Sequence, residues 1–320
     1  MRRLVFSLSI ILIIALLTGC AEQKTETTAW QPKRLNKAIE LWEAGQPVYY
    51  KGVYGGYEEG KAHAKTWADI LLYNMEHKPV NFTLLREFMQ GLVDGGPTPS
   101  GHRTPCVVVL VPALGTDAET FKGGSWMIQQ ALAQGAHGIH LCRARDPEAV
   151  KLFVQNARFP VHKQGVDVVG EGVRGWGSHI YASQIWGLSR EEYLQKADVW
   201  PLNPEGEIIL GIKIEDPHAL KNAVKSTAVP GLAFAEHGPR DFGLSLGFLE
   251  GRADPPVPEG VNRAGDIVLG LCDKNGLAFL DNVLPDNVAG QIDRGVDIGA
   301  GSVREAAIEG RKYTKRKMPW

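Results

Sequence analysis

The sequence predicts an α/β protein with a (β/α)8 barrel. Eight short apolar runs alternate with longer amphipathic segments, and this alternation implies parallel strands joined by helices. Apolar residues are nearly continuous within most runs, as expected for strands that are covered on both faces. Eight such units are the number that a closed barrel needs. The runs span residues 48–53, 68–73, 106–111, 138–142, 208–214, 231–235, 276–280 and 295–298.

A doubly wound open sheet is the alternative, because it also alternates strands with helices. The glycine-rich phosphate loop typical of its nucleotide-binding members does not follow the first run, which favours the barrel. Two stretches exceed a minimal barrel: a Gly/Pro-rich loop at 88–105 and an excursion at 160–207. An excursion of that length is usually functional or forms an interface. Residues 303–317 predict a final charged helix.

The first twenty residues predict export and a lipid anchor. Arg2 and Arg3 precede an apolar core at 5–17 of the length found in secretory signals, and this core is too short for a convincing membrane span. It ends in LTGC, so Cys20 is the predicted lipidation site. We therefore expect a signal peptide at 1–19, a lipidated tether at 20–32 and a single barrel domain at 33–320. The protein would lie on the periplasmic side of a membrane or at the cell surface.

Charge and cysteine content exclude several classes of protein. The formal net charge is −1, and removal of residues 1–19 takes away two arginines and no acid, which leaves about −3. This charge excludes a strongly basic nucleic-acid binder. Cys106, Cys142 and Cys272 remain without CxxC spacing, so neither a disulfide framework nor a zinc ribbon is indicated.

Polar side chains cluster directly after the predicted strands, where barrel enzymes carry their active sites. Acidic residues at the ends of buried apolar runs need a partner, because burying an unpaired carboxylate costs free energy. A hard divalent cation such as Mg²⁺ or Mn²⁺ is one partner that oxygen ligands suit. The residues concerned are Glu76, His77, Arg143, Arg145, Glu215, Asp216, Glu236, His237, Gly238, Pro239, Arg240 and Asp241.

Several of these segments, in this order and spacing, resemble the HpcH/HpaI aldolase/citrate lyase family of metal-dependent 2-oxo-acid aldolases. The similar stretches are LLYNMEHKP at 71–79, GVRGWGS at 172–178, IKIEDPHALKN at 212–222 and GPRDFGLSLG at 238–247. Residues 186–208 are similar to a branch of 2,4-dihydroxyhept-2-ene-1,7-dioic acid aldolases. The resemblance covers about residues 36–313. It implies a TIM barrel of the phosphoenolpyruvate/pyruvate superfamily type and a homo-oligomer, often hexameric, with exchanged C-terminal helices.

The resemblance also assigns roles to residues. Its metal-binding acids match Glu215 and Asp241, and its active-site histidine matches His77, with Glu76 beside it. The cation would bind an oxo acid such as pyruvate, and His77 would take the hydroxyl proton of the substrate in retro-aldol cleavage. Gly238 and Pro239 would shape the turn that carries Asp241. His237, next to this turn, is a further candidate for contact with the substrate.

Three departures from the family pattern bear on activity. The family's Asp before the histidine is Asn74 here, its arginine after the third strand is Val111, and the acid that pairs with its histidine is Ala133. Loss of an oxyanion-stabilising donor typically costs about a hundred- to a thousandfold in rate. Arg143 or Arg145, after the fourth strand, is the predicted substitute for the lost positive charge, although a surface salt bridge is an equal alternative for Arg145.

Three functions follow from this pattern. The first is a carbon–carbon lyase that cleaves a 2-oxo-4-hydroxy acid to pyruvate, or a related oxo acid, and an aldehyde. The second is a membrane-anchored barrel that binds oxo acids but has lost aldolase activity. The third, a structural lipoprotein, does not explain why acids are retained at the strand ends.

Overall fold

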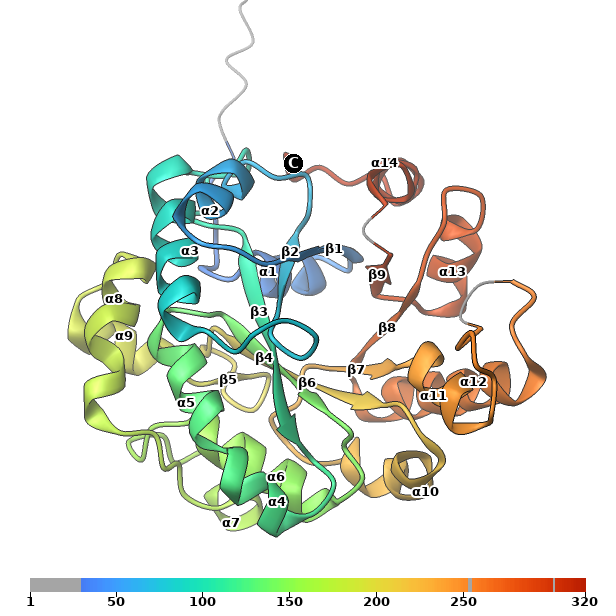
Figure 1. The fold of residues 1–320 in the computed structure, drawn as a ribbon. Coiled ribbons are helices and arrows are strands. Elements are labelled where there is room, and N and C mark those ends of the chain that lie inside the picture. Colours follow the sequence, from blue (N-terminus) through green and yellow to red (C-terminus); the bar gives the residue numbers. More distant parts are fainter. Residues whose placement is uncertain (1–29, 253–254, 302) are drawn as a thin grey trace, which may run out of the picture.

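A closed barrel of eight parallel strands forms the centre of the computed structural model, which describes residues 30–252, 255–301 and 303–320 (Figure 1). Each strand pairs with its neighbours in chain order, and the β4–β6 and β1–β9 pairings complete the ring. The predicted (β/α)8 barrel is thereby confirmed. The predicted signal peptide at 1–19, the lipidation site Cys20 and most of the tether at 20–32 lie outside the described residues.

All eight predicted apolar runs overlap a strand of the barrel. These strands are β1 (Val48–Val53), β2 (Ile70–Asn74), β3 (Cys106–Leu114), β4 (Gly138–Cys142), β6 (Ile208–Ile214), β7 (Phe234–His237), β8 (Ala278–Asn282) and β9 (Ile298–Ala300). A further strand, β5 (Val199–Trp200), pairs with the start of β6 and was not predicted. Two residues are too few to give a periodic pattern.

Four strands, β2, β7, β8 and β9, begin two or three residues later than predicted, and a glycine turn precedes the last three of them. Gly231, Gly276 and Gly295 have φ values of +97°, +67° and +108°, which lie in the left-handed region that favours glycine. Gly276 and Gly295 also end the preceding helices, in the way that glycine commonly ends a helix. The glycines therefore belong to the turns and not to the strands.

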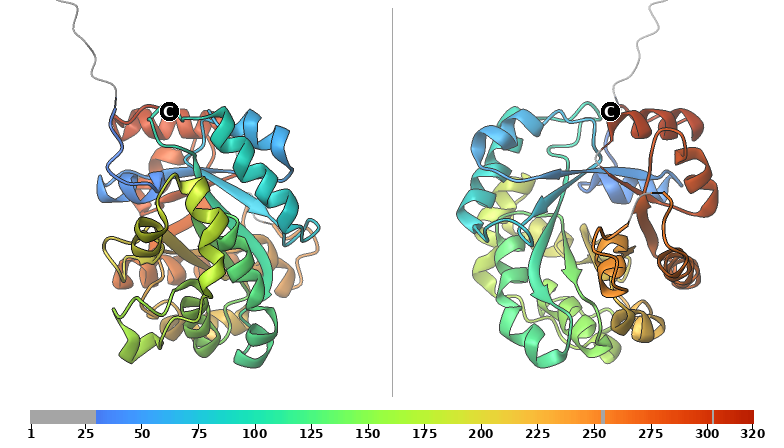
Figure 2. Two further views of the ribbon diagram at one scale, coloured as in Figure 1. Left: turned by 90° about the vertical axis from the view of Figure 1, so that its left-hand side faces the viewer. Right: turned by 45° about the vertical axis from the view of Figure 1, so that its right-hand side comes forward.

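Helices surround the strands on all sides (Figure 2). They are α1 (Lys37–Glu43), α2 (Tyr57–His63), α3 (Phe82–Gly95), α4 (Ala118–Gly124), α5 (Trp126–Ala133), α6 (Pro147–Ala157), α7 (Val166–Val169), the 3-10 helix η1 (Trp176–His179), α8 (Ile180–Trp186), α9 (Arg190–Lys196), α10 (Pro217–Ser226), α11 (Pro239–Ser245), α12 (Glu259–Asn275), α13 (Val288–Arg294) and α14 (Arg304–Tyr313). Among the described residues, no helix has the length and apolar character needed to cross a membrane.

The excursion at 160–207 is a folded layer and not an open loop. It holds α7, η1, α8, α9 and β5. The buried guanidinium of Arg158 donates to both carboxylate oxygens of Asp198, at 2.6 and 3.0 Å. Trp186 donates its indole N–H to the carbonyl of Gly135 at 2.9 Å and stacks on the ring of His137. The excursion is thus fastened to the barrel wall at the start of β4.

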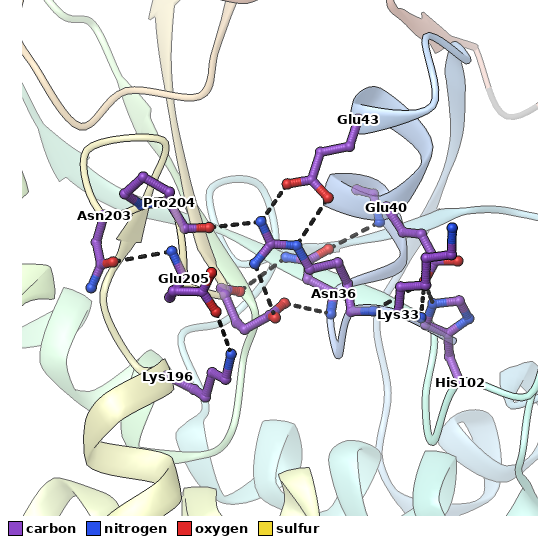
Figure 3. A network of polar contacts seen from close by, with 12 residues as sticks. Lys33, Asn36, Glu40, Glu43, His102, Lys196, Asn203, Pro204 and Glu205 are labelled. Carbon is purple, nitrogen blue, oxygen red and sulfur yellow. Dashed lines mark hydrogen bonds and ion pairs between the residues drawn. The ribbon is translucent and has the colours of Figure 1, made fainter. Parts of the chain in front are cut away.

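The N-terminal segment closes the end of the barrel at which the strands begin. Ala38, Ile39 and Leu41 of α1 pack against inward-facing strand residues such as Val48 and Ile70. Figure 3 shows the polar contacts around this helix. The side chain of Glu40 accepts hydrogen bonds from the backbone of Lys33 and Arg34 and contacts His102 at 3.1 Å. Asn36 binds Glu207, which lies just before β6.

Asp69 fastens both ends of the domain to this closed end. Its carboxylate lies 3.0 Å from the Lys37 ammonium of α1, 3.0 Å from the guanidinium of Arg311 and 2.7 Å from that of Arg316. Burial alone raises the pKa of Asp69, but the charges of Arg316, Lys37 and Arg311 outweigh it and hold this pKa well below its ordinary value. One buried acid therefore joins the first helix, β2 and the last helix.

We expect Asp69→Asn to lower the free energy of unfolding by about 3–5 kcal/mol, because it leaves three buried cations without their shared partner. An acid with a lowered pKa stabilises the fold above its unfolded pKa, and that contribution is lost as the pH falls. Stability of the variant should therefore depend less on pH between about pH 5 and pH 3. Urea denaturation at several pH values measures both effects. Glu119→Gln, which breaks an exposed pair with Lys122, is the control and should change nothing measurable.

Candidate active site

The site lies at the carboxyl ends of β6 and β7. Polar side chains of these strands point into the barrel there. Ile212 and Ile214 pack against the helix layer, so Lys213 and Glu215 face inward because side chains alternate along a strand. Lys213 and Glu236 are register partners in the β6–β7 pairing. An ammonium and a carboxylate are thus neighbours on the inner wall of the barrel.

The buried ammonium of Lys213 joins acids from two sides of the barrel. Its Nζ lies 2.8 Å from Oε2 of Glu215 and 3.0 Å from Oε2 of Glu76, which follows β2. Only 7% of the Lys213 side chain and 2% of the Glu215 side chain are exposed. Burial lowers the pKa of Lys213, but the surrounding carboxylates outweigh it and raise this pKa above its usual value. Lys213 is therefore a permanent cation and not an amine nucleophile.

Glu215 is held by the backbone that follows β4. Its Oε1 accepts a hydrogen bond of 2.8 Å from the backbone N–H of Arg143, whose φ of +51° is unusual for a residue other than glycine. Its Oε2 has the close contact with Lys213 but no well-aligned hydrogen bond to the described residues. Burial raises the pKa of Glu215, and the nearby carboxylates of Glu76 and Asp241 add to the rise.

Asp241 enters the site through a tight turn after β7. Gly238 packs against Glu215: a side chain at this position would place its Cβ 2.7 Å from the Cβ of Glu215. Pro239 then begins α11, and Asp241 lies half-buried in the first turn of this helix. The charge of Asp241 raises the pKa of both Glu215 and Glu236. The two predicted metal ligands therefore belong to the same electrostatic cluster at the mouth of the barrel.

The turn after β2 is organised by Asn74. Its side-chain oxygen accepts hydrogen bonds of 3.0 Å from the backbone N–H groups of Glu76 and His77. An amide oxygen performs this role as a carboxylate would, so Asn74 keeps the turn despite its departure from the family pattern. The His77 ring is 63% exposed, with Nε2 3.4 Å from Oε2 of Glu76. His77 thus stands at the rim, oriented by the acid beside it.

Glu236 and His140 form a second polar pair deeper in the barrel. His140 Nε2 lies 3.5 Å from Oε2 of Glu236, and neither ring nitrogen of His140 has a hydrogen bond to the described residues. Burial and the charge of Lys213 lower the pKa of His140 to about 3, so this ring is neutral. Burial raises the pKa of Glu236 to about 7; Lys213 opposes the rise, and the carboxylates of Glu215, Glu76 and Asp241 increase it.

Several predicted residues lie elsewhere. His237 points away from the cluster into a separate cavity of about 610 Å³, which Asp281 and Arg294 also line. Arg145 pairs with Asp216 at 2.8 Å, so its alternative interpretation as a salt bridge is the one observed. Asp216 also caps α10. The side chain of Arg143 is exposed, and only its backbone contacts the acids.

The two other departures from the family pattern lie away from the mouth. Val111 is fully buried in the layer between the barrel and its helices. Ala133 ends α5 and lines a surface cleft together with Arg86 and Tyr181. Neither position places a polar group in the cluster.

Two contacts in the site were not predicted from the sequence. They are the ion pairs of Lys213 and the pair that Glu236 forms with His140. A signal was present, because a lysine two residues before an acid, within a run of isoleucines, predicts an inward charge on a barrel strand. Glu215 is only two residues from Lys213, but Glu76 follows a strand distant in sequence, so the contact between Lys213 and Glu76 could not be inferred.

The cluster fits a divalent cation held by Glu215 and Asp241. Carboxylate oxygens are ligands that Mg²⁺ accepts, commonly one or two from the protein with the rest from substrate and water. Glu215 Oε2 lacks a well-aligned hydrogen bond, and mutual repulsion raises the pKa of the acids. Within the described ranges, no group of three or more His, Cys, Asp or Glu residues could hold a metal ion. A cation here would therefore need exogenous oxygen ligands.

Comparisons with known proteins identify the fold. No family model and no curated protein matches the sequence. Among solved structures, an HpcH/HpaI aldolase/citrate lyase family protein from Burkholderia cenocepacia J2315 is similar over 87% of this chain and 97% of its own, with 22% identity and a TM-score of 0.63. An HpcH/HpaI aldolase from Desulfitobacterium hafniense DCB-2 has 19% identity and a TM-score of 0.61, over 87% of this chain and 95% of its own.

A third similar structure carries ligands. It is a citrate lyase beta subunit from M. tuberculosis complexed with oxaloacetate and magnesium, with 12% identity and a TM-score of 0.51 over 85% of this chain and 98% of its own. The structural neighbours are thus aldolase and citrate lyase family proteins, and the predicted resemblance is confirmed at the level of the fold.

We expect Glu236 to titrate near pH 7, where ordinary glutamates are already ionised. A folded-state pKa above the unfolded one means that the folded protein holds the extra proton. Stability is therefore lost as the pH rises from about 4.5 to about 7. Glu236→Gln should remove on the order of 1–3 kcal/mol of this pH dependence. Infrared titration of the carboxyl bands and urea denaturation across this range test both points; an unchanged carboxyl band in the variant would contradict the assignment.

Proposed function

We propose that the protein is a divalent-metal-dependent carbon–carbon lyase of the HpcH/HpaI aldolase/citrate lyase family, cleaving a 2-oxo-4-hydroxy acid to pyruvate, or a related oxo acid, and an aldehyde. One observation carries the proposal: Glu215 and Asp241 follow adjacent strands and share one electrostatic cluster at the mouth of an aldolase-type barrel. The partner is accordingly a small oxo acid. The citrate lyase neighbour that holds oxaloacetate and magnesium supports this ligand class.

Glu215 and Asp241 would hold the cation, with Mg²⁺ or Mn²⁺ preferred because their ligands are oxygens. When bound, the cation supplies Lewis acidity for the keto oxygen of the oxo acid. Gly238 leaves room at this point, since a side chain there would strike Glu215. The exposed guanidinium of Arg143, whose backbone holds Glu215, supplies positive charge near the carboxylate of the substrate.

His77 is the proposed base. Its exposed ring stands at the rim of the mouth, with Nε2 beside Glu76. His77 takes the proton of the C4 hydroxyl group, the C3–C4 bond breaks, and the aldehyde forms as the leaving fragment. The electron pair passes into the oxo acid, which is then protonated at C3 to give pyruvate. Glu76, 3.4 Å from Nε2, orients the ring.

A second function is favoured by Val111 and Ala133, which place no arginine and no acid at the mouth. In this alternative the protein is a membrane-anchored barrel that binds oxo acids without turnover. Ligand-induced thermal stabilisation without any reaction would support it.

We further propose that the mature chain is exported and attached through Cys20 to membrane lipid, and that it forms a homo-oligomer. The n-region, the apolar core and the LTGC sequence support the anchor. The oligomer rests on the resemblance to the aldolase family alone.

Deuterium exchange at C3 of pyruvate tests the metal site directly. With Mn²⁺, the wild type should exchange these protons, and Glu215→Gln and Asp241→Asn should each lower the rate by at least about a hundredfold. Asp216→Asn is the matched control: it lies beside Glu215 but caps α10, which asparagine also does, so exchange should stay within about twofold. Proton NMR follows the reaction. No exchange by folded wild type with any divalent metal would count against the lyase and favour the binding alternative.

The anchor is tested by Cys20→Ser. The wild type should sediment with membranes and become labelled by radioactive palmitate in the native host. The variant should carry no label, because the thiol that would receive the lipid is gone. An equal label on both proteins would place the lipid elsewhere or contradict the lipoprotein assignment.

A further inference from the structure

The ammonium of Lys213 lies against the carboxylate that would hold a cation at Glu215. Oε1 of Glu215 accepts a hydrogen bond from the Arg143 backbone, whereas Oε2 has no well-aligned hydrogen bond to the described residues and would be the readier of the two oxygens to bind a metal ion. The ammonium of Lys213 lies 2.8 Å from this same Oε2. An ammonium and a divalent cation repel each other at such distances, and they would compete for one carboxylate oxygen.

The ammonium has other partners within reach. Nζ already contacts Glu76 at 3.0 Å, and Glu236 is the register partner of Lys213 on β7. An ammonium has three N–H donors on a flexible stem. It can therefore leave Glu215, keep its contact with Glu76 and turn toward Glu236 on the neighbouring strand. This displacement does not leave a buried charge without a partner, which would be the main cost.

We propose that Lys213 is a built-in competitor of the divalent cation, occupying Glu215 Oε2 when no metal is bound and moving to Glu76 and Glu236 when metal binds. The proposal rests on the metal site at Glu215 and Asp241 under the proposed function. It assigns Lys213 two effects: it keeps the acidic mouth folded without metal, and it weakens the affinity for metal. A residue that does not itself bind the metal ion thereby lowers the affinity for it.

Titration with Mn²⁺ alone, without an oxo acid, measures the competition. Isothermal calorimetry at pH 8, where protons compete less for the carboxylates, gives the dissociation constant. We expect Lys213→Met to bind Mn²⁺ at least about tenfold more tightly than the wild type. Without metal, Lys213→Met should melt at a lower temperature, and Mn²⁺ should raise its melting temperature more than that of the wild type.

Two further variants make the result interpretable. Lys213→Gln keeps an N–H donor toward Glu76 but carries no charge, so it should also bind Mn²⁺ more tightly and serves if Lys213→Met does not fold. Lys196→Met is the control. It removes a lysine that pairs with Glu205 at 3.1 Å in the excursion, away from the mouth, and should leave the affinity unchanged.

The outcomes separate this proposal from the proposed function. Tighter binding by both Lys213 variants supports the competitor role. If the wild type binds no Mn²⁺ but the Lys213 variants do, the competitor role is supported and the metal-dependent lyase is not. If the wild type binds Mn²⁺ and the variants bind it equally or more weakly, the competitor role is overturned while the lyase stands. If none of these proteins binds Mn²⁺, both proposals fail.

Discussion

Closure of the parallel barrel is the constraint on which the rest of this structure depends. The β1–β9 and β4–β6 pairings complete a ring in which every strand runs in the same direction. The carboxyl ends of all strands then open at one mouth. Lys213 and Glu236 lie on the neighbouring strands β6 and β7, whereas Glu76 follows β2, and closure of the ring brings Glu76 to Lys213 across the barrel. At the opposite end, Asp69 pairs with Lys37 of the first helix and Arg311 of the last helix.

Several carboxylates at one mouth repel one another, and the structure relieves part of this repulsion. Burial raises the pKa of Glu236 to about 7, with the carboxylates of Glu215, Glu76 and Asp241 adding to the rise, so this acid keeps its proton up to near neutrality. Lys213 offsets more of the charge through two close ion pairs. A buried cation among acids is stable only while both partners remain. The same imbalance would favour the divalent cation that we propose.

The departures from the aldolase pattern have different structural meanings. Asn74 accepts the same backbone hydrogen bonds that a carboxylate would, so the turn that carries His77 is kept. Val111 faces the helix layer, where an arginine could not be accommodated without burying an unpaired charge. Lys213, on a different strand, places a positive charge beside Glu76 and Glu215.

The sequence by itself determined the barrel, since each of its eight strands lies within or overlaps a predicted apolar run. Local propensity and strand periodicity need no knowledge of distant partners. It also placed Glu215 and Gly238 directly after β6 and β7 and Asp241 just beyond, because a strand end and a Gly-Pro turn are local signals; the binding of a metal by these acids stays a prediction. Only the tertiary structure decided which side chains meet: it paired Lys213 with Glu76 and Glu215, turned His237 outward, and placed His140 beside Glu236. Such pairings depend on strand register and barrel closure, and a single chain does not state these in any local pattern.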